Sequence, residues 1–136
     1  MAADPPLGYV MHRLHMALRG EVTEAVLEPL GLTFPEYICL RMLSHSPGAS
    51  NAELARNISV SRQAMNLVLR GLQDRGLVRR PPTAEKGRAR PAELTAAGSK
   101  LLGRTDSGVR AAEERILATL SGADRAQFRR ILAALI

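Results

Sequence analysis

The segment NAELARNISVSRQAMNLVLR, residues 51–70, decides the fold because it has the spacing of two short helices joined by a tight turn. Leu54 and Ala55 face the partner helix, and the small alanine permits a close crossing. Ser59 occupies the turn position, where glycine is commoner, and its β-branched neighbours plug the angle between the helices. Met65 returns the second helix to the core. The segment therefore predicts a helix-turn-helix.

The second helix of this unit, residues 61–73, has one apolar and one polar face. Apolar side chains recur at the spacing of a helix face: Met65, Val68, Leu69 and Leu72. The other face carries guanidinium and carboxamide groups: Arg62, Gln63, Asn66, Arg70 and Gln73. These groups have paired donors and acceptors that match the edges of guanine and adenine. An ordinary amphipathic surface helix has the same pattern, so this stretch alone leaves both interpretations open.

The net charge of the chain, +6, is concentrated in residues 50–90. That stretch holds nine basic and three acidic side chains, while the remainder of the chain holds ten of each. A chain that is neutral outside one basic block is expected to bind a polyanion through that block. Aromatic residues make up only 3% of the chain, which argues against a base-stacking surface for single strands or RNA.

A basic hairpin is predicted directly after the second helix. Two short extended pieces, LVRRPP and RPAEL, flank the polar segment TAEKGRA. Beside a recognition helix, such a wing can enter the adjacent minor groove, so the two features together predict a duplex-DNA-binding site. Its expected contacts are base edges from Ser61, Arg62, Gln63 and Asn66, a phosphate from Arg70, the DNA backbone from Ser50 and Asn51, and wing contacts from Lys86, Arg88 and Arg90.

The rest of the chain is predicted to form helices on both sides of this unit. A first helix of roughly twenty residues begins near Leu7. Thr33 and Glu36 have the pattern of a capping box for a second helix, Thr95 can begin a long helix, and Ser121 can begin a last one. The predicted fold class is mainly α with a β wing, in the order α-α-α-α-β-β-α-α.

Three glycines, Gly98, Gly103 and Gly108, lie inside the long helix that is expected after Thr95. Each costs about 1 kcal/mol relative to alanine in an exposed helix interior. A bend or a close helix–helix contact would explain them, and the sequence does not distinguish the two.

The chain resembles the MarR (multiple antibiotic resistance regulator) winged-helix transcription factors over nearly all of its 136 residues. The resemblance is carried by GLTFPEYICLRML in the second helix, LQDRGLVRR after the recognition helix and GRARPAELTAAG through the wing. It implies one MarR-like domain, residues 1–136, with residues 33–95 as the DNA-binding lobe and residues 1–32 plus 96–136 as dimerisation helices. It also implies a homodimer, most often a repressor, on a pseudo-palindromic operator. The apolar surface of the terminal helices independently favours such a dimer.

One departure from the family pattern concerns the wing. The family usually has an acidic residue two positions before the wing arginine, here Arg88, and this chain has Lys86 instead. Because the acidic residue helps to orient the arginine, the resemblance implies a more mobile Arg88 here, unless Glu85 substitutes.

The resemblance also implies a ligand, because many family members release DNA when a small aromatic or phenolic anion binds between the dimer base and the winged lobe. By position, the candidate pocket residues are His15, Tyr37 and Arg41. Two alternatives stay open. One is a redox-responsive regulator acting through Cys39, although the mid-helix position favours a buried inert thiol. The other is a winged-helix protein-interaction module without DNA specificity.

Other classes of function find little support in the sequence. No Ser/His/Asp or Cys/His set, phosphate loop or metal motif indicates an enzyme, and no cofactor is expected. His12 and His15 have i, i+3 spacing, but no further ligands complete a zinc site. The single cysteine fits a reducing compartment, and neither a membrane span nor a signal peptide is recognisable, so a cytoplasmic location is expected.

Overall fold

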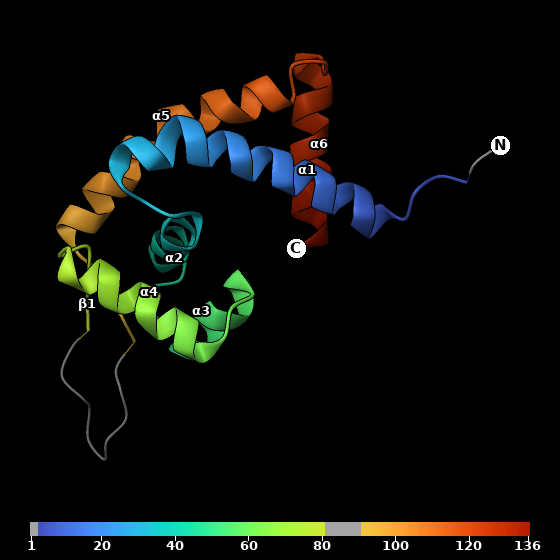
Figure 1. The fold of residues 1–136 in the computed structure, drawn as a ribbon. Coiled ribbons are helices and arrows are strands. Elements are labelled where there is room, and N and C mark those ends of the chain that lie inside the picture. Colours follow the sequence, from blue (N-terminus) through green and yellow to red (C-terminus); the bar gives the residue numbers. More distant parts are fainter. Residues whose placement is uncertain (1–2, 81–90) are drawn as a thin grey trace.

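The structure is a computed structural model that describes residues 3–80 and 91–136. A long N-terminal helix that ends in irregular helical turns comes first. Three helices and a two-stranded sheet follow, and two more helices end the chain (Figure 1). The elements are α1 (Leu7–Val22), the π-helical turn η1 (Thr23–Leu27), the 3₁₀ turn η2 (Glu28–Leu30), α2 (Phe34–His45), α3 (Asn51–Ile58), α4 (Arg62–Asp74), β1 (Val78–Arg79), β2 (Glu93–Leu94), α5 (Ala96–Ile116) and α6 (Gly122–Leu135). The predicted fold class and element order are confirmed.

The helices after the first one begin where the sequence places a hydroxyl cap. Thr33 and Glu36 form the predicted capping box. The Thr33 amide donates to Oε1 of Glu36 at 2.8 Å, and the Glu36 amide donates to Oγ1 of Thr33 at 3.2 Å. Ser61, Thr95 and Ser121 each accept a hydrogen bond from the backbone N–H three residues later. Such caps satisfy amides that have no partner inside the helix, which fixes the starting points locally.

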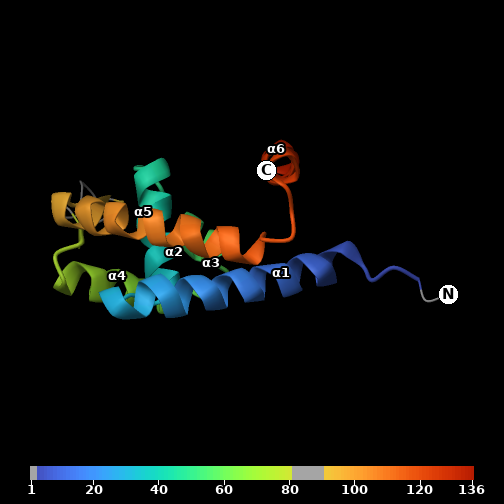
Figure 2. The same cartoon turned by 90° about the horizontal axis from the view of Figure 1, so that it is seen from above.

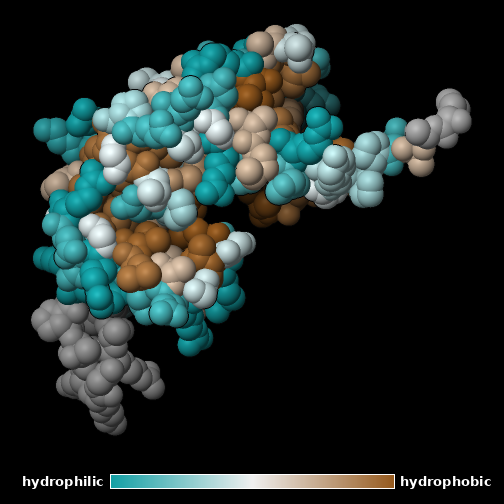
Figure 3. All heavy atoms as spheres, in the orientation of Figure 1, coloured by the Kyte–Doolittle hydropathy of each residue, from teal (hydrophilic) through white to brown (hydrophobic). Residues whose placement is uncertain are grey.

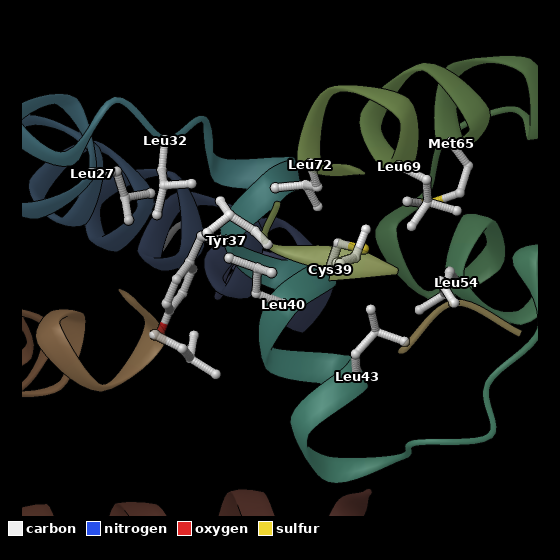
Figure 4. Close-up of a cluster of buried hydrophobic side chains, with 14 of the residues drawn as sticks. Leu27, Leu32, Tyr37, Cys39, Leu40, Leu43, Leu54, Met65, Leu69 and Leu72 are labelled. Atoms are coloured by element: carbon white, nitrogen blue, oxygen red, sulfur yellow. The ribbon is translucent and has the colours of Figure 1, made fainter. Parts of the chain in front are cut away.

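Helix α2 lies between two layers. Helices α1 and α5 run side by side on one side of it, and α3 and α4 lie on the other (Figures 1 and 2). The core where α2, α3 and α4 meet consists of fully buried aliphatic side chains (Figure 4): Leu40, Leu43, Leu54, Met65, Leu69 and Leu72. The short antiparallel sheet pairs Val78 with Leu94 and Arg79 with Glu93.

The structure shows why two of the three glycines in α5 are there. A Cβ on Gly98 would lie 2.1 Å from the backbone oxygen of Leu77, and a Cβ on Gly108 would lie 2.9 Å from Cγ2 of Val26. Gly98 therefore allows a close approach to the backbone just before β1, and Gly108 a close approach to the π-helical turn η1. A Cβ on Gly103 would meet nothing within 4 Å.

The terminal helices expose much apolar surface. Helix α6 has no buried residue and projects at an angle from the end of α5 (Figures 1 and 2). The large exposed apolar side chains on α1 and at the C-terminal end are Leu7, Tyr9, Val10, Met11, Leu14, Met16, Ile131, Leu132, Leu135 and Ile136. Apolar atoms are visible around α6 in the space-filling view (Figure 3). None of the helices in the described ranges is long and apolar enough to cross a membrane.

Candidate nucleic-acid interface and effector pocket

The recognition helix α4 orients its two faces as its periodicity predicts. Met65, Leu69 and Leu72 are fully buried, while the predicted base-reading side chains Arg62, Gln63 and Asn66 are exposed, together with Arg70. Ser61 is also exposed, and its hydroxyl oxygen accepts a hydrogen bond of 3.0 Å from the Ala64 amide. The first turn of α4 therefore presents Arg62 and Gln63 to solvent, while Met65 packs the helix into the core.

The turn before α4 uses a strained residue. Ser59 has φ +61°, a left-handed conformation that glycine adopts more easily than any residue with a Cβ. The next residue closes the turn, because the Val60 amide donates to the Ala55 carbonyl oxygen at 3.0 Å. Ile58 and Val60, on either side of Ser59, are half-buried against the core, as expected for residues that plug the interhelical angle.

Asn66 does more than face outward. Its side-chain oxygen Oδ1 accepts from Nδ2 of Asn51 at 3.0 Å and from Nη2 of Arg80 at 3.2 Å. These bonds tie α4 to the start of α3 and to the residue after β1. Because the oxygen already accepts from two donors, the amide nitrogen of Asn66 is the group whose hydrogen bonds remain to be made. The sequence analysis missed the role of Arg80, since no helical or strand spacing links residues 51, 66 and 80.

The other predicted backbone-contacting residue, Ser50, caps α3 by accepting from the Glu53 amide at 3.1 Å. Asn51 follows it and is half-buried. The predicted wing residues Lys86, Arg88 and Arg90 lie outside the described residues. The expected effect of Lys86 on Arg88 therefore stays a prediction.

Part of the basic block serves the fold. Arg75 donates to the backbone oxygens of Gly31 and Leu30 at 2.7 and 3.3 Å. Arg79 pairs with Glu93 at 2.7 Å across the two strands. The charge of this stretch therefore overstates the number of cations that are available to a polyanion.

A second site lies between α2, the C-terminal half of α5 and the start of α6. It is an open cavity of about 750 Å³. Its lining is rich in charged groups and includes Tyr37, Arg41, His45, Asp106, Val109, Arg110, Glu113, Glu114, Leu117, Arg125 and Arg129. The structure thus brings two of the predicted pocket residues, Tyr37 and Arg41, together.

His15 is not among the residues lining this cavity. Its ring packs edge-on against the ring of Phe34, with 5.8 Å between the centroids. The predicted grouping of His15 with Tyr37 and Arg41 is therefore not found within this chain. Of the described residues, no group of three His, Cys, Asp or Glu side chains has the arrangement of a metal site.

Arg41 is the most constrained cation in the cavity. Its Nη2 lies 2.9 Å from a carboxylate oxygen of Asp106, 3.2 Å from the Tyr37 hydroxyl and 3.4 Å from Oγ1 of Thr105. Partial burial disfavours its charge, but the bonds to Asp106 and Tyr37 outweigh that cost and raise the pKa of Arg41 above its ordinary value. Arg41 is therefore a fixed positive charge on one wall of the cavity.

The sequence analysis missed the arginines that α6 contributes to the cavity. Arg125 is held by the backbone oxygens of Leu117 and Leu120 at 3.2 and 3.1 Å, and Arg129 is paired with Glu113. They come from the last helix, more than eighty residues from Arg41, so local spacing could not associate them.

Cys39 is fully enclosed in the core. Burial, reinforced by the charge of Glu36 and opposed by that of Arg80, raises the pKa of its thiol to about 12. The thiolate is the reactive form, so this environment supports the expectation of an inert thiol and weakens the redox alternative.

Comparison with known proteins gives one consistent result. The model of the MarR family matches residues 30–89. The HTH-type transcriptional repressor Rv2887 of Mycobacterium tuberculosis (strain ATCC 25618 / H37Rv) is 54% identical over 132 residues, which cover 97% of this chain and 94% of that protein.

Solved structures of the M. tuberculosis protein also resemble this chain. Its complex with salicylic acid has a TM-score of 0.85 at 52% identity and full coverage of both chains. Its complex with DNA has a TM-score of 0.78 at 50% identity, covering 97% of this chain and 98% of that one. On this sequence identity, and with the winged helix-turn-helix in place, the chain belongs to the MarR family of transcription regulators.

Proposed function

We propose that this chain is a dimeric transcription repressor that binds a pseudo-palindromic DNA duplex and releases it when a small aromatic carboxylate binds. The observation that carries the proposal is the recognition helix α4, whose guanidinium and carboxamide groups are exposed above a fully buried apolar stripe. The complex of the M. tuberculosis relative with DNA supports this assignment.

The roles of the DNA-contacting residues follow from their place on α4. Arg62, Gln63 and Asn66, on its first two turns, are assigned to base edges in the major groove. Arg70, farther along the helix, is assigned to a phosphate. The backbone contacts of Ser50 and Asn51 and the cap residue Ser61 belong to the same proposed surface, and the wing contacts of Lys86, Arg88 and Arg90 are proposed from the sequence alone.

A second copy of the chain is the proposed occupant of the apolar surface on the terminal helices. The exposed side chains of α1 and α6 are too many and too large for a monomer surface in water. In a two-fold dimer built on residues 1–32 and 96–136, the two copies of residues 33–95 would read half-sites about 34 Å apart. A location in the cytoplasm, with the chromosomal DNA, is part of the proposal.

The cavity at Tyr37 and Arg41 is the proposed effector site. It joins α2, which packs on the DNA-binding helices, to α5 and α6, which lead to the dimer base. A ligand that fits the cavity better in one arrangement of these helices shifts the protein toward that arrangement. Salicylic acid, which is bound in a solved complex of the relative, has the aromatic ring and carboxylate that the tyrosine and the arginine would recognise.

The test is a fluorescence-anisotropy titration of the purified protein on duplex DNA from upstream of its own gene. A scrambled duplex serves as the comparison, at two salt concentrations and with or without sodium salicylate. We expect a preference of about a hundredfold or more for the upstream duplex, within the usual range for specific recognition, and a loss of that binding with salicylate. Equal and steeply salt-dependent binding to both duplexes would contradict sequence-specific recognition of the upstream duplex.

Two variants separate the proposed roles on α4. Asn66→Ala should lower the preference among duplexes by roughly 1–3 kcal/mol, whereas Arg70→Ala should weaken all duplexes similarly and reduce the salt slope by about 1. Equal losses on specific and scrambled DNA for Asn66→Ala would contradict its role as a base-reading residue.

A third variant tests the cavity. Arg41→Ala should raise the salicylate concentration needed for release by about tenfold or more, because a charge-assisted bond to the carboxylate is lost.

A further inference from the structure

Leu67 is an unusual residue on α4 because its side chain is 63% exposed. The other large exposed apolar side chains in the described part of the chain all lie on α1 or at the C-terminal end, on the proposed dimer surface. Leu67 instead belongs to α4, the helix that is assigned to the major groove and that lies on the other side of α2 from α1 (Figure 1). Its exposure therefore needs an explanation of its own.

Helix geometry places Leu67 at the centre of the outward face. At about 100° per residue, it lies about 160° around the axis from both Met65 and Leu69, which are fully buried. Its neighbours on the adjacent turns are Gln63, four residues before it, and Arg70, three residues after it, and both are exposed. A single exposed leucine elsewhere on a protein surface would require no explanation, but this one lies between side chains that are assigned to DNA.

The major groove offers one apolar group at its base edges, the C5 methyl of thymine. A leucine side chain has no hydrogen-bonding group, so within a base-reading face it can recognise only such a group. We propose that Leu67 is a specificity-determining residue that contacts a thymine methyl in each half-site, an inference that rests on the proposed DNA-binding function. Gln63 would read a hydrogen-bonding base edge, Arg70 would contact a phosphate, and Leu67 between them would select thymine over cytosine and the purines.

The experiment removes only the methyl group. A duplex is first selected from a random pool by the full-length protein, and each thymine of the selected site is then replaced singly by deoxyuridine. For the wild type, we expect one thymine position in each half-site to be sensitive, and the two positions to be related by the two-fold symmetry. Replacement of either thymine should lower the affinity about fourfold, the factor that corresponds to burial of one methyl-sized group. For L67A, the same replacement should leave the affinity unchanged.

Two control variants make the result specific. L67M keeps an apolar side chain of similar reach and should retain most of the thymine-to-uracil ratio. R62A should lower the affinity for the selected duplex while keeping that ratio. Because Leu67 is exposed, L67A should have the same thermal midpoint as the wild type, which separates lost recognition from lost folding.

The outcomes distinguish this inference from the function on which it rests. Failure to enrich any duplex would overturn the proposed sequence-specific binding and the inference with it. Selective binding with no uracil-sensitive thymine, or with the same sensitivity in L67A as in the wild type, would overturn the role of Leu67 alone.

Discussion

Replacement of Gly98 by alanine is expected to destabilise the protein by about 2–4 kcal/mol, although alanine is the better helix former. The new Cβ would lie 2.1 Å from the backbone oxygen of Leu77, whereas ordinary contact begins at 3.4 Å. The start of α5 would have to move by about 1.3 Å, the difference between these distances. The neighbour is backbone, so it cannot turn away as a flexible side chain would.

That movement would disrupt two hydrogen bonds at the base of the wing. The Thr95 amide donates to the same Leu77 oxygen at 3.1 Å, and the Thr95 hydroxyl donates to the Gly76 oxygen at 2.7 Å. Each bond is worth about 1 kcal/mol net, and strain from overpacking adds about 1–3 kcal/mol. The higher helix propensity of alanine returns about 1 kcal/mol, which leaves the net loss given above.

The assay is urea unfolding followed by circular dichroism at 222 nm, with all variants at one protein concentration because the proposed dimer would make stability depend on concentration. Gly103→Ala is the matched control in the same helix. It meets nothing within 4 Å and should gain up to about 1 kcal/mol. If Gly98→Ala were as stable as Gly103→Ala, the close contact between α5 and Leu77 would not constrain residue 98.

Three further predictions concern other parts of the molecule. Ser59→Gly should raise the free energy of unfolding by about 0.5–1 kcal/mol, because its φ of +61° strains any residue with a Cβ; a lower urea midpoint would contradict this. Burial raises the pKa of the Cys39 thiol from 9.0 to about 12, so the folded state favours the neutral thiol. Above about pH 9 the unfolded chain loses this proton first, so the free energy of unfolding should fall by up to about 1.4 kcal/mol per pH unit. A Cys39→Ala variant should lack this additional slope in urea midpoints measured between pH 8 and 10. Asp106→Asn should tighten salicylate binding several-fold in calorimetry, because it removes the carboxylate that competes for the guanidinium of Arg41; weaker binding would place the anion elsewhere.

The site could be predicted from the sequence as far as it depends on helical periodicity. The two faces of α4 follow from the spacing of its apolar residues, and their burial is as expected. Leu67 was open to the same reasoning, since its place between Gln63 and Arg70 is a matter of helical spacing. What periodicity could not give is the bond pattern at Asn66, whose two donors come from other elements.

The pocket shows the same limit more strongly. Residue positions in the family pattern suggested His15, Tyr37 and Arg41, but only the last two line the cavity, and His15 packs on Phe34. Asp106, the partner of Arg41, is 65 residues away in the sequence. Such pairs depend on how α2 and α5 cross, and no local spacing encodes that crossing.

The sequence by itself determined what depends on neighbours along the chain: where helices begin, which face of each is apolar, where the turn at Ser59 falls, and that the chain resembles the MarR family. The reason is that caps and faces arise from groups three or four residues apart. Only the tertiary structure decided that Gly98 lies against the backbone of Leu77 and that Arg41 faces Asp106. Those facts depend on distances between segments remote in sequence, which are set by the packing of the whole core.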